Sequence, residues 1–166
     1  MNNEKCSVNQ NPIWLINDIN KFIIEMDDWI GEKCGYCEYM YKLNKHEKIF
    51  YINQIFEREV NNGGFLQFIY NMGDDFTFID VLNSLREIGA NKTIEIFENL
   101  LNVIGRDFPL NQHDKNKLLE KVVTNAVSNK INELSMQFYS YPDNLNALNY
   151  QYIINNKEMF GWKHEG

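Results

Sequence analysis

The amino-acid sequence predicts an all-α protein: a single compact multi-helix domain of about seven or eight helices with short loops. Apolar residues recur three and four positions apart through most of the 166 residues, and this spacing is typical of helices with one buried face. Capping residues and glycines separate these periodic segments, whereas no long alternating segment indicates a strand. The connections between the segments are short, as in helical bundles.

Start and stop signals define the helices of the first half of the chain. Asn11 and Pro12 place an N-cap residue before a proline at the first helical position, where no backbone N–H is needed. Asn44 and Glu47 form a capping box for a second helix. The run Asn-Asn-Gly-Gly at 61–64 should end that helix, because glycine tolerates the left-handed backbone of a helix stop.

Similar signals continue through the second half. Thr77 and Asp80 form another capping box, and Asn91 can cap the helix that follows. Asn111 with Asp114 opens one more helix. The expected helices span, in order, residues 12–30, 45–60, 78–88, 91–104, 111–126, 129–141 and 145–156, and a short apolar segment lies at 65–70.

The chain divides into three parts in this interpretation. Residues 1–44 form an N-terminal helical extension packed on the domain, residues 45–160 form the domain itself, and residues 161–166 form a tail. No segment approaches the roughly 20 apolar residues of a membrane helix, and the start of the chain is too polar for a signal peptide. We therefore expect a cytoplasmic protein that has no membrane partner.

The chain is acidic, with 23 Asp and Glu residues against 16 Lys and Arg residues and a formal charge of −7. An acidic protein repels phosphate backbones, so direct binding to nucleic acid is disfavoured. Residues 57–107 hold nine acids and four bases, which gives this segment a charge of −5. The acidic excess is therefore expected mainly in the middle of the chain.

The same middle segment carries the most specific motif of the chain. Residues 59–68 read Glu-Val-Asn-Asn-Gly-Gly-Phe-Leu-Gln-Phe, and Tyr-Asn follows at 70–71. A later segment, 85–90, reads Leu-Arg-Glu-Ile-Gly-Ala. With these motifs, residues 45–160 resemble a bacterial family of DNA-mimic-like proteins, formerly a domain of unknown function.

The resemblance implies an all-α fold, an acidic surface and a homodimer. For the protein after which the family is called, it implies binding to a DNA-binding protein in place of DNA. It implies no catalytic residue and no cofactor. We therefore expect a non-enzymatic protein-interaction module whose partner is a basic or DNA-binding protein, such as a bacterial DNA-binding regulator.

The candidate partner-binding surface consists of acidic residues around the motif. Carboxylates three or four positions apart on a helix lie about 5–6 Å apart at their Cβ atoms, so one helix face can approximate a row of phosphates. The alternative is that these are ordinary solvated acids that serve solubility or helix N-termini. The candidate residues are Glu57, Glu59, Asp74, Asp75, Asp80, Glu87, Glu95 and Glu98.

The sequence Cys34-Gly35-Tyr36-Cys37 is the one motif that suggests chemistry. A C-x-x-C pair can lower one thiol pKa and bring two sulfurs within disulfide range, but redox motifs of this kind usually follow a strand. A zinc site would need further ligands, for which Cys6 and His46 are the conceivable residues. A small redox or metal-binding protein is thus an alternative function, beside coincidental loop cysteines. No catalytic or metal-binding residue is assigned.

The family motif itself is interpreted as a structural corner. Two glycines let the helix stop and turn the chain so that the following phenylalanines reach the core. One alternative is a backbone nest for an anion or a peptide terminus, and another is a ligand pocket between helices near Phe65 and Asn71. The corner residues are Asn61, Asn62, Gly63, Gly64, Phe65, Phe68 and Asn71.

Overall fold

The computed structural model describes residues 12–106, 120 and 125–162, and every regular element among them is helical. The all-α prediction is therefore confirmed, with slightly fewer helices described than expected, and most of the helix expected at 111–126 lies outside the described residues. The α-helices are α1 (Ile19–Lys33), α2 (Lys45–Asn71), α3 (Phe78–Ile88), α4 (Asn91–Ile104), α6 (Asn125–Tyr139) and α7 (Leu145–Asn155). The 3-10 helices are η1 (Pro12–Leu15), η2 (Met40–Lys42) and η3 (Lys157–Phe160).

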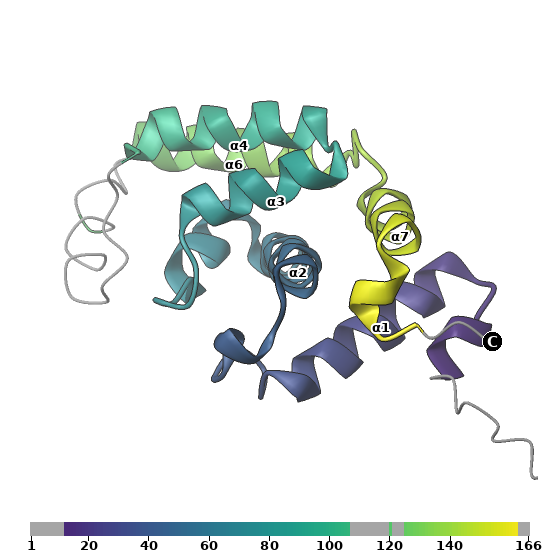
Figure 1. Ribbon diagram of the computed structural model, residues 1–166. Helices are drawn as coiled ribbons and strands as arrows, with labels where there is room; N and C mark the ends of the chain where they lie inside the picture. Colours follow the sequence, from purple (N-terminus) through teal and green to yellow (C-terminus); the bar gives the residue numbers. More distant parts are fainter. Residues whose placement is uncertain (1–11, 107–119, 121–124, 163–166) are drawn as a thin grey trace, which may run out of the picture.

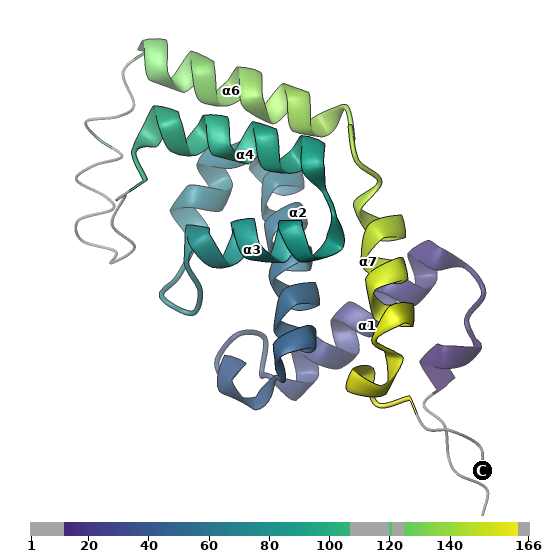
Figure 2. The same cartoon turned by 45° about the horizontal axis from the view of Figure 1, so that its top comes forward.

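The long helix α2 lies at the centre of the molecule, and α1, α3, α6 and α7 all pack against it (Figure 1). Figure 2 shows α6, α4 and α3 one below another beside the C-terminal half of α2. In the same view, α1 crosses near the beginning of α2, and α7 packs on α1. The N-terminal helix is therefore part of the same packed body as the helices of the family motif.

The Asn-Asn-Gly-Gly segment interrupts the helical geometry of α2, as expected, and the chain resumes a helix directly after it. Gly63 (φ −171°, ψ 25°) and Gly64 (φ 75°, ψ −173°) leave helical geometry, so the helix bends there and continues to Asn71. The expected helix stop is thus a corner between two helical halves. The first half buries its whole apolar stripe, which consists of Ile49, Ile52, Phe56 and Val60.

Two helix starts differ from the sequence-based expectation. The first expected helix, 12–30, is divided into η1 and α1, because Asp18 caps α1 by accepting a backbone hydrogen bond from its first turn at 2.8 Å. Helix α4 is not capped by Asn91: the Asp143 carboxylate accepts the backbone N–H of Thr93 at 2.7 Å and its hydroxyl at 3.0 Å. Asp143 comes 50 residues later in the sequence, so only the tertiary structure provides this cap.

The core beneath the corner is a cluster of aromatic rings. The ring of Phe56 lies 6.2 Å from that of Phe65, 5.2 Å from those of Phe68 and Phe97, and 5.5 Å from that of Phe138, measured between centroids. Most of these pairs meet edge to face, which is a favourable arrangement of ring quadrupoles. The two phenylalanines of the motif therefore join α2 to α4 and α6.

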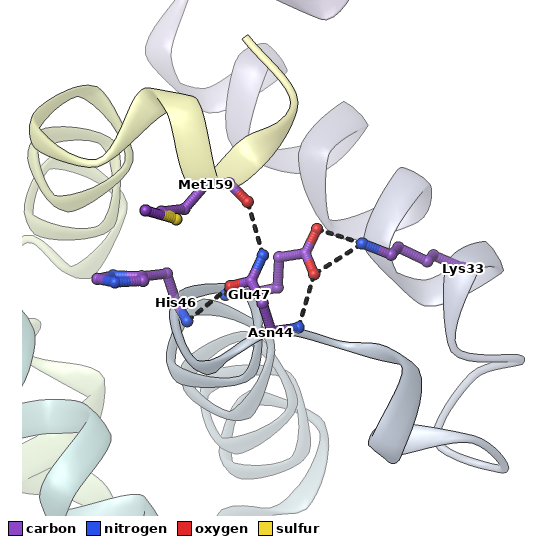
Figure 3. A network of polar contacts seen from close by, with 5 residues as sticks. All are labelled: Lys33, Asn44, His46, Glu47 and Met159. Atoms are coloured by element: carbon purple, nitrogen blue, oxygen red, sulfur yellow. Dashed lines mark hydrogen bonds and ion pairs between the residues drawn. The ribbon is translucent and has the colours of Figure 1, made fainter.

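A polar network joins α1 to the start of α2 (Figure 3). The ammonium group of Lys33 lies 2.6 and 2.8 Å from the two carboxylate oxygens of Glu47, whose side chain is 1% exposed. Glu47 also accepts the backbone N–H of Asn44 at 2.9 Å, and Asn44 completes the expected capping box. The Asn44 amide donates to the carbonyl of Met159 at 2.7 Å, so α1, α2 and η3 meet at one point.

Candidate partner-binding surface

The two glycines of the motif leave backbone groups free, and α6 satisfies them. The Phe65 N–H donates to Ser135 Oγ at 2.9 Å, and the Tyr139 hydroxyl donates to the Val60 carbonyl at 2.9 Å. A Cβ atom on Gly64 would lie 2.8 Å from Ser135 Oγ, and φ at this residue is +75°. Glycine is therefore required at this point both for the backbone conformation and for the close approach of α6.

The asparagines of the motif differ in their surroundings. The Asn61 side-chain amide donates to the Tyr141 hydroxyl at 2.7 Å, while the side chain of Asn62 is exposed and forms no hydrogen bond with a described residue. The Asn71 amide donates to a carboxylate oxygen of Glu59 at 2.7 Å and so connects the two halves of α2. None of these contacts involves a basic side chain, so they lend no support to an anion nest.

Four of the eight candidate acids lie on α3 and α4, and each has a partner among the described residues. Asp80 belongs to the capping box of α3 and accepts the backbone N–H of Thr77 at 2.7 Å. The other three lie next to cations and do not present uninterrupted negative charge. Their ion pairs are Glu87–Lys45 at 3.4 Å, Glu98–Arg86 at 3.1 Å and Glu95–Lys92 at 3.5 Å.

A cavity of about 840 Å³ lies between helix α3 and the first turns of α2. We call it the α2–α3 groove. Its floor contains two isoleucines, and its charged lining combines three cations with two acids. Among the charged groups, Lys48 has no partner among the described residues. The lining residues are Lys45, Lys48, Ile49, Ile52, Asp80, Asn83, Ser84, Arg86 and Glu87. This region is therefore mixed in charge rather than acidic.

The remaining candidate acids lie near the end of the first half of α2, before the glycine corner, and in the loop that follows α2. Asp74 and Asp75 are exposed and form no hydrogen bond or ion pair with the described residues. Glu59 uses one carboxylate oxygen to accept from Asn71 and keeps the other oxygen available. These three acids present charge that no neighbouring cation cancels.

Glu57 contributes less charge than its residue type suggests. Burial, with a smaller contribution from the neighbouring Asp27 carboxylate, raises the pKa of Glu57 from 4.5 to about 7. Burial also raises the pKa of Asp27, although the Arg58 guanidinium, 2.6 Å from one of its oxygens, acts in the opposite direction. Glu57 is thus only partly ionised at neutral pH.

A row of acids on α1 was not among the sequence-predicted candidates. Glu25, Asp28 and Glu32 are exposed, and their carboxylates form no hydrogen bond or ion pair with the described residues. Their spacing of three and four residues places them on one face of α1, opposite the buried residues Ile23 and Ile30. We call these three residues the α1 acidic row. The spacing is visible in the sequence, but α1 lies outside residues 57–107, where the acidic excess was expected.

The C-x-x-C cysteines form a free, shielded pair. Cys34 is buried and Cys37 is half-buried. Burial is the main cause that raises the pKa of the Cys37 thiol, which disfavours the thiolate that redox chemistry needs. The described residues also contain no group of three or more His, Cys, Asp or Glu side chains arranged to hold a metal ion, and Cys6 lies outside them. The structure therefore offers little support for the alternative redox or metal-binding function.

The fold and this surface define a small all-α protein that presents acidic side chains on an N-terminal helix and on a loop beside a glycine corner. The chain belongs to the family of DMP19-like proteins, whose profile matches residues 41–156. The match confirms the resemblance to DNA-mimic-like proteins over nearly the same range as the sequence motifs indicated. Neither a curated protein nor a solved structure matches the chain. No helix in the part of the chain that the structure describes is long and apolar enough to cross a membrane.

Proposed function

We propose that this protein is a non-enzymatic interaction module that binds a basic, DNA-binding protein through an acidic surface in place of DNA. Membership of the DMP19-like family supports the protein-binding class. The observation that carries the proposal is the α1 acidic row, because its three carboxylates are exposed and have no partner among the described residues. Asp74 and Asp75 add further uncancelled charge on the loop after α2.

The spacing of the α1 acidic row suits a protein that normally contacts DNA. With a rise of about 1.5 Å per residue, Glu25 and Glu32 are separated by about 10 Å along the helix axis. One DNA strand carries about three phosphates over the same length. A helix face with three carboxylates therefore offers a basic partner a comparable density of negative charge.

The test compares two charge reversals of equal size. The variant Glu25→Lys, Asp28→Lys, Glu32→Lys reverses the α1 acidic row, and Glu87→Lys, Glu95→Lys, Glu98→Lys reverses the paired acids of α3 and α4. Proteins captured from a lysate of the source organism by the wild-type chain are identified, and their affinities for the three forms are measured.

We expect the first variant to lose at least about tenfold in affinity and the second to lose less than about threefold, because paired acids contribute little. Binding of the captured protein to duplex DNA should be inhibited by the wild-type chain, and the affinity should fall steeply with salt. Equal loss in both variants, or capture of proteins that do not bind DNA, would contradict the proposal.

The homodimer implied by the family resemblance belongs to the same proposal. Two exposed apolar side chains away from the α1 acidic row, Leu15 on η1 and Ile19 at the start of α1, support an association between copies of the chain. Sedimentation equilibrium tests it: a mass near twice 19.7 kDa is expected, and Leu15→Lys should shift the protein towards the monomer. A monomer at all concentrations would exclude this part of the proposal.

A further inference from the structure

A second cavity, of about 290 Å³, lies where the turn after α1, the middle of α2 and the loop after α2 meet. We call it the Tyr51 pocket. Its apolar lining includes Ile55, Phe68 and Phe76, all of which are buried members of the core. Tyr51, which is 2% exposed, contributes the hydroxyl-bearing ring to the same lining. The pocket therefore offers an apolar surface that can hold the aliphatic part of a side chain.

The rim of the Tyr51 pocket is negative. Glu59 and Asp75 line it from α2 and from the following loop, and neither carboxylate has a cationic partner among the described residues. The one cation in the lining, Arg58, is held at 2.6 Å by Asp27, which cancels its charge. A ligand that enters the pocket thus meets two uncancelled carboxylates above an apolar floor.

This combination suits a long cationic side chain, since lysine and arginine pair an aliphatic stem with a charged head. Arginine fits better than lysine. Its planar guanidinium has five N–H donors and can bind two carboxylates on different elements at once. Tyr36, whose side chain is 64% exposed at the pocket, also offers a ring on which a guanidinium can stack.

We propose that the Tyr51 pocket receives one arginine side chain of the basic partner, with its stem against Ile55 and Phe76 and its guanidinium between Glu59 and Asp75. This inference rests on the proposed function, since it supplies the anchor of the same interaction. The pocket and the α1 acidic row are neighbours: Asp27, which binds Arg58 in the pocket lining, precedes Asp28 of the row. Anchors of this kind often dominate the affinity of an interface.

The first test uses small probes and the full chain. N-acetyl-arginine amide is titrated into isotope-labelled protein and compared with N-acetyl-citrulline amide, which has nearly the same shape and no charge. We expect the arginine probe to shift the amide signals of Asn71 and Gly73, which line the pocket, and the citrulline probe to bind at least about tenfold more weakly. Equal binding of the two probes would overturn the proposal.

The variant Glu59→Gln, Asp75→Asn removes the rim charge while it keeps the shapes and the acceptor for Asn71. The matched control is Asp74→Asn, Glu95→Gln, which removes two exposed acids that do not line the pocket. We expect the arginine probe to lose at least about tenfold in affinity for the first variant and to bind the control like the wild type. Unchanged binding to the first variant would overturn the proposal, provided that its spectrum shows a folded protein.

Two results separate this inference from the proposed function. If the captured basic partner loses affinity for the α1-row reversal but not for Glu59→Gln, Asp75→Asn, the interaction surface stands and the arginine anchor is wrong. If the arginine probe binds in the pocket but no basic partner is captured, the pocket is real and the proposed function fails. Loss of the partner in both variants supports both proposals.

Discussion

Two regions of this protein are rich in acidic residues, and they differ in what surrounds the carboxylates. Around the α2–α3 groove, Glu87 and Glu98 lie within ion-pair distance of Lys45 and Arg86. On α1 and on the loop after α2, acids such as Asp28 and Asp75 have no cation beside them. The density of acids along the sequence is therefore a poor measure of the charge that a folded surface presents.

The difference has a simple physical origin. Basic residues near the groove come from the start of α2 and from α3, and packing these helices side by side brings opposite charges together. The acids of the α1 acidic row are exposed and form no ion pair with a described residue, although Lys21 precedes Glu25 by one turn of the same helix. Exposed ion pairs contribute little to stability, but they neutralise the field that a basic partner would sense.

The largest effect on stability is expected at Glu47, which joins α1 to the start of α2. Replacing Glu47 by alanine removes both contacts to Lys33 and the hydrogen bond to the Asn44 backbone. We expect a loss of about 3 kcal/mol in the free energy of unfolding, measured by urea denaturation. Glu47→Gln keeps the capping geometry and should lose less. An unchanged stability in Glu47→Ala would show that α1 is held mainly by apolar packing.

A smaller effect is expected at the corner that positions the second half of α2 and the loop acids. In Gly64→Ala, the new methyl group meets Ser135 and the left-handed backbone is strained, which should cost about 2 kcal/mol. Gly89→Ala is the control, because its φ of +77° is similar but no atom lies within 4 Å of the added Cβ. The free energy of unfolding of Gly89→Ala should fall by about 1 kcal/mol in the same denaturation experiment. Equal costs would mean that the contact with α6 is unimportant.

The raised pKa of Glu57 makes the stability of the protein depend on pH. Its folded pKa is raised from 4.5 to about 7, so the unfolded chain ionises first and stability falls as the pH rises through this interval. Glutamine at this position has no carboxyl group that must ionise in a buried place. We therefore expect Glu57→Gln to be more stable than the wild type by about 1–2 kcal/mol at pH 8. The difference should vanish at pH 4, as measured by thermal unfolding at several pH values. A difference that does not depend on pH would contradict the raised pKa.

The smallest effect is expected among the paired acids of the groove side. Glu98→Gln breaks an exposed ion pair with Arg86, whose two side chains are 38% and 51% exposed. Stability should change by less than about 0.5 kcal/mol, since such pairs are screened by solvent. Denaturation at low and high salt provides the measurement. A loss above about 1 kcal/mol would show that the Glu98–Arg86 ion pair stabilises the fold. The paired acids of α3 and α4 would then differ from the α1 acidic row in function as well as in charge.

Much of the local structure could be predicted from the sequence. The capping boxes at Asn44 and Thr77 form as the residue spacing indicated, because their partners lie within one helical turn. The bend at Gly63 and Gly64 also follows from residue type, although the chain resumes a helix beyond it. The chain's resemblance to DNA-mimic-like proteins likewise depended on contiguous residues, and the family match confirms it.

The candidate surface was less predictable, because charge pairing and burial depend on residues that are far apart in the sequence. Lys45 approaches Glu87 across 42 positions, and Arg58 approaches Asp27 across 31. No pattern of neighbouring residues indicates which side chains so far apart in the sequence will meet. The same holds for the raised pKa of Glu57, which arises from burial between helices. The eight candidate acids thus remain a prediction as a binding site, and only Glu59, Asp74 and Asp75 among them present uncancelled charge, together with the acids of α1.

By itself, the sequence determined the helical class, most helix boundaries, the buried stripes and the place of the glycine corner. These features depend on backbone hydrogen bonds and side-chain periods that act over three or four residues. Only the tertiary structure decided that Asp143 caps α4, that α6 completes the corner, and that α1 carries the unpaired acids. Those outcomes depend on which faces pack together, and packing joins residues that the sequence keeps far apart.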